Sequence, residues 1–260
     1  MTYRRRIFRA YIALSVFFTL IDVPQAHEAE IAPTAFAEDA SYKPVQSFLD
    51  GFKFMGDRES QATLAIGTGA FFGARLLDEE ARDYFGGQQR IGNLSKIGND
   101  YLGTAVPGAL LAGGLWAYGE FAPDPFSKHA GQAQFESLIV TILLVSALKA
   151  AIQRNRPDGS DDDSFPSAHT AMAFSTATVL NEFYGWKWGV PAFMLAGLTA
   201  AARMQDNRHW LSDTVGGATI AILVGRAFSR SHLNKLSQSN LNISPTFHEG
   251  GAGLVMRWEF

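Results

Sequence analysis

The chain has 260 residues, of which 47% are apolar and 18% charged, so it is more apolar and less charged than an average soluble domain. A net charge of −3 gives no basic surface of the kind that nucleic-acid-binding proteins carry, and we expect no nucleic-acid partner. The absence of cysteine excludes disulfides, cysteine-ligated metals and thiol nucleophiles.

The first residues have the composition of an export signal. Four arginines lie within residues 4–9, a charge-free apolar run covers residues 10–21, and the small residue Ala26 follows. We therefore predict a signal at residues 1–26 that carries the protein out of the cytoplasm. Because the apolar run is short for a bilayer span, an uncleaved membrane anchor is the alternative.

Beyond a mobile N-terminal segment at 27–59, which contains a short amphipathic piece around 45–55, apolar stretches rich in Gly and Ala predict an all-α fold. We expect a bundle of about six core helices in a domain over residues 60–235. The six predicted helices cover residues 60–77, 101–118, 133–154, 167–184, 188–204 and 209–228.

Most charge-free runs in these helices are short. The runs 61–74, 137–148 and 188–202 fall below the roughly 20 residues that cross a bilayer, and only 101–119 approaches that length. We therefore predict a bundle that folds outside the inner membrane and contacts it. An integral membrane protein is the alternative.

The tail, residues 236–260, changes character. Its last residues alternate between apolar and polar or charged types, and Gly250-Gly251 is a candidate turn, so the pattern predicts a short C-terminal β-hairpin or strand packed on the bundle. A sorting tail for the outer membrane, ending in the aromatic Phe260, is the sharper alternative.

Three clusters of polar residues stand out from this apolar background. In the first, Lys149 and Arg156 are seven residues apart, which on one helix places both on nearly the same face before Pro157 ends it. Two cations beside apolar residues repel each other unless an anion lies between them, and phosphate is the anion that Arg and Lys bind best.

In the second cluster, Pro166-Ser167-Ala168-His169, Ser167 is a good N-cap for the next helix. The free N–H groups of a first helical turn bind anions, and His169 on that turn can reach a leaving-group oxygen.

The third cluster contains Arg203, His209 and Asp213. Asn207 is a plausible cap for a helix on which His209 and Asp213, four residues apart, lie on one face. A carboxylate that fixes one ring nitrogen leaves the other as a nucleophile.

Each cluster alone also fits an ordinary surface role, such as solvated cations, a capping serine or a surface His–Asp pair. Their order and spacing together resemble the type 2 phosphatidic acid phosphatase (PAP2) superfamily, which includes bacterial acid phosphatases and vanadium haloperoxidases. That family has Lys-x6-Arg-Pro, then Pro-Ser-Gly-His, then Ser-Arg-x5-His-x3-Asp. The chain departs from this pattern at Ala168, in place of Gly, and at Ala202, in place of Ser.

The resemblance implies a metal-independent double displacement without a cofactor. In it, His209 attacks phosphorus to form a phosphohistidine, Asp213 orients His209, and His169 protonates the leaving oxygen. The phosphate would be held by Lys149, Arg156, Ser167, Ala168 and Arg203, and vanadate should inhibit as a phosphate mimic.

We therefore expect a phosphatase on the periplasmic face of a bacterial cell envelope. Its substrate would be a phosphate monoester or a diphosphate, either a phosphorylated small molecule or a lipid phosphate. The alternatives are a vanadium-dependent haloperoxidase and a non-specific soluble periplasmic acid phosphatase.

Overall fold

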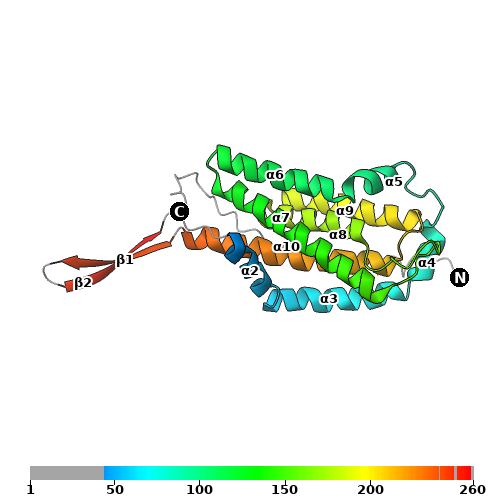
Figure 1. Ribbon diagram of the computed structural model, residues 1–260, viewed down its shortest axis with the longest axis horizontal. Coiled ribbons are helices and arrows are strands. Elements are labelled where there is room, and N and C mark those ends of the chain that lie inside the picture. Colours follow the sequence, from blue (N-terminus) through cyan, green and yellow to red (C-terminus); the bar gives the residue numbers. More distant parts are fainter. Residues whose placement is uncertain (1–43, 240, 249–250, 259–260) are drawn as a thin grey trace.

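The computed structural model describes residues 44–239, 241–248 and 251–258, so the predicted signal at 1–26 lies outside the described residues. Within them, long helices run side by side in an elongated bundle, and a two-stranded hairpin lies beyond one end (Figure 1). The helices are α2 (Pro44–Phe54), α3 (Arg58–Arg75), α4 (Asp78–Phe85), α5 (Leu94–Lys96), the π-helix η1 (Ile97–Leu102), α6 (Ala105–Phe121), α7 (Pro125–Ile152), α8 (Ala168–Tyr184), α9 (Trp186–Gln205) and α10 (Leu211–Ser239).

The prediction of an all-α bundle is confirmed, because α3 and α6 to α10 correspond to the six predicted helices. The number six was imprecise. The acidic helix α4 was missed because it is only eight residues long, and the short elements α5 and η1 were missed as well.

The helices cross two of the limits drawn from the sequence. Helix α10 continues to Ser239, beyond residue 235, and the amphipathic piece expected around 45–55 is helix α2, which packs on the bundle. The reason for the second is aromatic packing, because the rings of Phe48 and Phe52 lie 5.7 and 5.5 Å from that of Phe228 on α10.

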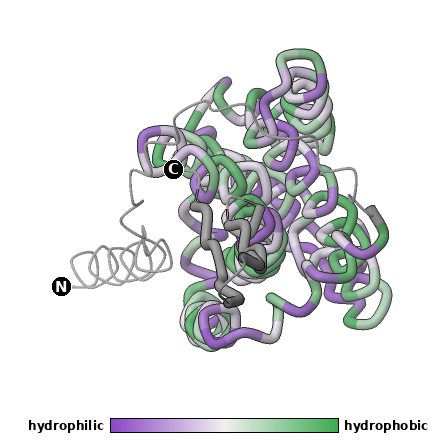
Figure 2. Tube along the Cα trace, turned by 90° about the vertical axis from the view of Figure 1, so that its left-hand side faces the viewer, coloured by the Kyte–Doolittle hydropathy of each residue, from purple (hydrophilic) through white to green (hydrophobic). Residues whose placement is uncertain are grey.

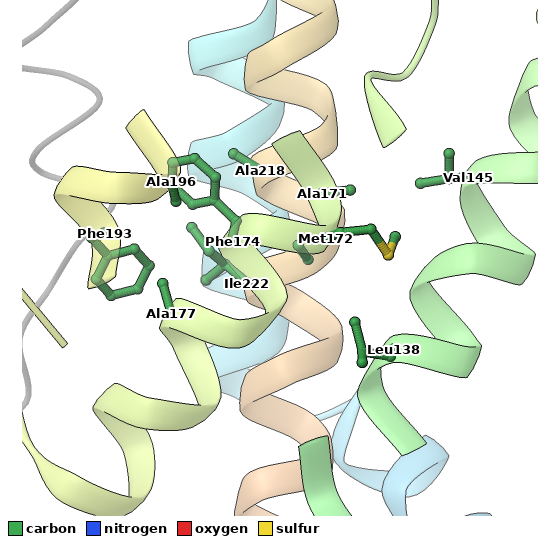
Figure 3. Packing of buried hydrophobic residues seen from close by; sticks show 11 residues of the cluster. Leu138, Val145, Ala171, Met172, Phe174, Ala177, Phe193, Ala196, Ala218 and Ile222 are labelled. Carbon is green, nitrogen blue, oxygen red and sulfur yellow. The ribbon is translucent and has the colours of Figure 1, made fainter. Parts of the chain in front are cut away.

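The core lies where α7, α8, α9 and α10 meet (Figure 3). Fully buried alanines such as Ala171 and Ala221 let the helices approach closely, and Phe174 packs against Phe193 with ring centroids 5.8 Å apart. This rigid packing fixes how the ends of the four helices lie relative to one another.

Two helices in the described part of the chain, α7 and α10, are long and apolar enough to cross a membrane. They differ in burial: 78% of the apolar window of α10 is buried inside the bundle, but only 33% of that of α7. A core helix passes the same test, so α7 is the more informative of the two.

The conclusion drawn from short charge-free runs was wrong for α7. In the sequence, Glu136 limits the charge-free run 137–148, but its side chain points into the bundle and pairs with His232 at 3.0 Å. Large apolar side chains instead face outward, with Leu143 62%, Leu110 72% and Met194 67% exposed on α7, α6 and α9. Apolar segments are correspondingly visible on the outside of the bundle (Figure 2).

Apolar surface of this extent is typical of contact with a membrane. This surface and the candidate span α7 favour the membrane-protein alternative over a soluble acid phosphatase.

The tail forms two antiparallel strands, β1 (Leu241–His248) and β2 (Gly251–Trp258), paired from Leu241 with Trp258 to His248 with Gly251. Figure 1 shows this hairpin projecting beyond the end of α10, at the opposite end of the bundle from α4, rather than packed along the helices as predicted.

Candidate active site

The first cluster is split by the end of α7. The helix stops at Ile152, and Gln153 takes up the left-handed conformation with φ 48° and ψ 55°. Arg156 therefore lies beyond the helix and not on its face, which corrects the prediction of one continuous helix up to Pro157. The turn at Gln153 nevertheless returns the chain to the same end of the bundle.

An acidic loop covers these cations. Lys149 Nζ donates to the backbone carbonyl of Asp163, and Arg156 Nε pairs with the carboxylate of Asp161. The backbone N–H of Arg156 also donates to the Asp161 carbonyl at 3.0 Å. The hydrogen bonds from Asp163 N–H and Arg156 hold the pKa of the Asp161 carboxyl below its usual value. The loop thus places its own anion on a cation that was predicted to bind phosphate.

Ser167 is the N-cap of α8, as predicted, and its side chain is directed at Thr170, with the two hydroxyl oxygens 3.0 Å apart. Its own N–H donates to the carbonyl of Asp213 at 3.0 Å. The free N–H groups of the α8 first turn belong to Ala168 and His169. The hydroxyl of Ser167 acts as a cap here, and its direct contact with phosphate stays a prediction.

Both departures from the family pattern have a structural context. Ala168 is the first residue of α8, so its helical backbone can present an N–H as a glycine would. Ala202 is fully buried against η1, where a methyl group added to Gly98 would lie 2.9 Å from its Cβ. A small residue is required at position 202 because η1 packs so closely on α9.

His169 is half-buried beside Gly103, whose position leaves no room for a side chain: an added Cβ would lie 2.8 Å from the His169 ring atom Cδ2. Burial, the largest cause, and the charges of neighbouring side chains together lower the pKa of His169 to about 4. These charges belong to Arg203, His209, Arg156 and Lys149. Gly103 is the C-cap of η1, whose Asn99 binds Arg203, so His169 and Arg203 lie against the same short helix.

Arg203, in the last turn of α9, is held by Asn99 of η1, which accepts from Nη1 at 3.3 Å. Asn99 in turn donates to Asp206. The Nε–H of Arg203 is buried without a partner among the described residues. A buried guanidinium with a free donor is suited to bind an anion.

His209 lies before α10, in the turn that leads to Leu211, and not on the helix as predicted. Asn207 is not a cap but a left-handed residue with φ 54°. The ring is 3% exposed, and its Nδ1 lies 2.6 Å from the carbonyl oxygen of Ser164. Because a carbonyl only accepts, Nδ1 carries the proton and the lone pair of the neutral ring is on Nε2.

Asp213 is close to His209 but does not fix its tautomer. The distance from Asp213 Oδ2 to His209 Nδ1 is 3.7 Å, longer than a hydrogen bond, so the carboxylate acts as a nearby counter-charge. Burial lowers the pKa of His209 to about 4 in spite of this attraction. The imidazole is therefore neutral at pH 7.

Four contacts in the site were not predicted. The carbonyl of Ser164 fixes His209, and Asn99 holds Arg203. Arg154 holds Asp213, and Asp78 in turn holds Arg154. A backbone carbonyl leaves no signal in a sequence, and Asn99 and Asp78 lie far from the motifs. A role for Arg154 could have been predicted from the sequence, because it lies two residues before Arg156 in the first cluster.

Comparison with known proteins matches this segment to one family. Residues 133–237 match the family model described as "PAP2 superfamily", a range that contains all three clusters. The lipid A 1-phosphatase of Porphyromonas gingivalis is 42% identical over 85 residues, which are 32% of this chain and 19% of that protein. The match thus spans about a fifth of the relative's length.

A comparison with solved structures gives a weaker match. The matched structure is described as a transmembrane PAP2 type phosphatidylglycerolphosphate phosphatase from Bacillus subtilis. The two chains share 22% identity with a TM-score of 0.44, over 75% of this chain and 98% of the other.

Proposed function

We propose that this protein, whose residues 133–237 belong to the PAP2 superfamily, is a membrane-associated phosphatase that hydrolyses a lipid phosphate monoester or diphosphate. The proposal rests on four placements. Lys149 and His209 bond the backbone carbonyls of the adjacent residues Asp163 and Ser164. Arg203 and His169 both lie against the short helix η1, Arg203 at Asn99 and His169 at its C-cap Gly103. Cations beside a neutral imidazole favour a tetrahedral anion, and the imidazole supplies the nucleophile.

In the first chemical step, Nε2 of His209 bonds to phosphorus as the bond from phosphorus to the leaving oxygen breaks. The choice of Nε2 follows from the Ser164 carbonyl, which holds the proton on Nδ1 at 2.6 Å. Attack makes the ring cationic, and the carboxylate of Asp213, 3.7 Å from Nδ1, stabilises that charge.

His169 gives its proton to the leaving oxygen in this step. In the second step it takes a proton from water, the water oxygen bonds to phosphorus, and the phosphorus–nitrogen bond of the phosphohistidine breaks. These steps release the alcohol first and inorganic phosphate second.

The low pKa of His169 fits this role once substrate is bound. Apart from burial, the causes are positive charges, and a phosphate dianion among them cancels their repulsion. We therefore expect substrate to raise the pKa of His169 and so to provide the protonated acid. No metal is needed in this scheme, because the cations already neutralise the phosphoryl oxygens.

The exposed apolar side chains of α6, α7 and α9 support a lipid as the substrate. A lipid phosphate reaches an enzyme from the surface of a bilayer, and a bundle that contacts the bilayer can receive it there. The matching relative is named for action on a lipid phosphate as well. The basic start followed by an apolar run supports a location in the cell envelope, with the site on its periplasmic face.

Release of inorganic phosphate by the full chain in detergent, with a metal chelator present, tests this proposal. We expect turnover of a lipid phosphate, lower turnover of p-nitrophenyl phosphate, inhibition of both by vanadate, and no activity in His209→Ala. Absence of phosphate release together with oxidation of bromide after addition of vanadate would replace the proposal with a haloperoxidase.

A further inference from the structure

The carboxylate of Asp213 belongs to a buried network that extends outside the three clusters. Arg154 donates through Nη1 to Asp213 Oδ1 and through Nη2 to Asp78 Oδ2, the latter at 2.7 Å. The two carboxylates are 0% and 2% exposed, and one guanidinium joins them. Asp78 is the first residue of α4 and lies outside the segment that matches the family.

Asp78 also holds the beginning of α10. Its Oδ1 accepts from the backbone N–H of Ser212 at 2.8 Å, and its Oδ2 accepts from the Ser212 hydroxyl at 2.8 Å. Arg154 Nη1 donates to the same hydroxyl at 2.7 Å. A carboxylate from another helix thus satisfies a free N–H of the α10 first turn, the turn that carries Asp213.

The remaining contacts of Asp213 are to the segment that carries His209. Its Oδ2 accepts from the N–H of Trp210 at 2.9 Å and from the hydroxyl of Ser164, whose carbonyl fixes the His209 ring. Arg154 lies 5.4 Å from the centroid of the Trp210 ring. Movement of Arg154 would therefore disturb the Asp213 carboxylate and, with it, Ser164 and Trp210, which lie beside the His209 ring.

We infer that Asp78 is a positioning residue for the proposed reaction: through Arg154 and Ser212 it holds Asp213, the counter-charge of His209, whose carboxylate in turn bonds Ser164 and Trp210 beside the ring. The inference rests on the proposed function. Asp78 contacts neither the phosphate-binding cations nor His169, so its loss should reduce the rate of phosphoryl transfer and leave substrate binding nearly unchanged.

Asp78→Asn is the test variant, since it keeps the volume of the side chain but turns an N–H₂ group toward a donor in either orientation, the guanidinium of Arg154 or the backbone N–H of Ser212. We expect kcat to fall by roughly tenfold or more, while KM and the inhibition constant of vanadate change by less than about threefold. Asp57→Asn is the matched control. Asp57 caps α3 and pairs with Arg230 at 3.3 Å, far from the site, so its loss should leave kcat unchanged.

A double-mutant cycle separates positioning from simple support of the fold. If Asp78 acts through Asp213, Asp78→Asn should lower kcat by less than about threefold in an Asp213→Asn background, measured with an activated aryl phosphate. Ser212→Ala, which removes one hydroxyl and no charge, gives a milder test and should lower kcat roughly three- to tenfold. The Ser212→Ala variant tests the role of Asp78 if Asp78→Asn does not fold or if Asp213→Asn is inactive.

Three outcomes would overturn the inference. The first is a wild-type kcat in folded Asp78→Asn or in Ser212→Ala, and the second is an equal loss of kcat in both backgrounds of the cycle. Either would leave the proposed phosphatase intact, because wild type still turns over. The third is a wild-type protein that releases no phosphate from any substrate, which would overturn the proposed function together with the role of Asp78.

Discussion

A single methyl group on α10 should displace the beginning of α8. A Cβ added to Gly217 would lie 2.5 Å from the carbonyl oxygen of Ser167, 3.4 Å from its carbonyl carbon and 3.5 Å from the nitrogen of Ala171. All three atoms belong to the backbone, so no side-chain rotation can relieve the contact. Gly217→Ala therefore acts on the N–H groups proposed to bind phosphate.

The size of the effect follows from the distance. Ordinary contact of a Cβ begins at 3.4 Å, so the Ser167 carbonyl or α10 must shift by about 1 Å. A misplacement of about 1 Å in a catalytic site can reduce the rate roughly 100-fold. Overpacking costs about 1–3 kcal/mol, and the better helix propensity of alanine offsets about 1 kcal/mol of this.

The assay compares kcat/KM for a lipid phosphate and the thermal unfolding midpoint in detergent. We expect Gly217→Ala to be folded, slightly less stable and roughly 100-fold less active. Gly113→Ala on α6 is the control, because a Cβ there meets nothing within 4 Å, and we expect unchanged activity. Wild-type activity in Gly217→Ala would refute the idea that the packing of α10 on α8 places the phosphate-binding turn.

Three further predictions concern the histidines and the acidic loop. The pKa of His209 is about 4 in the folded protein, against an ordinary value of 6.5. Between these pH values the unfolded chain binds more protons than the folded one. The contribution of the neutral His209 to stability is therefore complete above about pH 6.5 and is lost as the pH falls toward 4. By linkage this shift contributes about 3 kcal/mol to the free energy of unfolding. Denaturant titrations at about pH 7 and about pH 4.5 should therefore show a smaller loss of stability with falling pH in His209→Asn than in wild type. The same loss in both proteins would contradict the burial of a neutral His209. His169→Ala should lose roughly 100-fold or more in kcat on alkyl phosphates and much less on activated aryl phosphates, and equal losses would exclude an acid role. Asp161→Asn should lower KM about twofold or more, because it removes the anion paired with Arg156. Asp162→Asn, at an exposed neighbour with the same change of charge, is the control and should have little effect on KM. Equal changes of KM in the two variants would show that only net charge matters.

The sequence carried enough information for the helices and for much of the chemistry. Long apolar segments rich in alanine and glycine have few alternatives to buried helices, and α3 and α6 to α10 were predicted from them. Ser167 was predicted as a cap because capping depends on a residue and its next three neighbours. Local patterns of this kind can be read without knowledge of the fold.

Local patterns failed where the backbone turns. Spacing placed Arg156 on α7 and His209 on α10, but a left-handed residue, Gln153 or Asn207, intervenes before each. Gln is an unusual residue in that conformation, so the turn at Gln153 could not be predicted from composition. Asn adopts it more often, but Asn207 was equally suited to cap a helix, so its type alone did not decide between the two. The side chains still reach one site, because the turns lie at the same end of the bundle.

Contacts between distant residues could not be predicted either. Asp78 and Ser212 are 134 positions apart, and the acidic start of α4 reads as an ordinary charged turn. Glu136 likewise reads as an interruption of an apolar run, whereas it lies inside the bundle with His232. In both cases the packing of helices decides which way a charged side chain points.

The most direct test of the proposed nucleophile is to trap the phosphoenzyme. His169→Ala should accept a labelled phosphoryl group from an activated aryl phosphate but hydrolyse it slowly, because the base for the second step is missing. Rapid quenching should then yield an acid-labile, base-stable label on the peptide that contains His209, and no label when His209 is also replaced by Ala. Continued turnover with no such label, or a label on another residue, would contradict attack by His209.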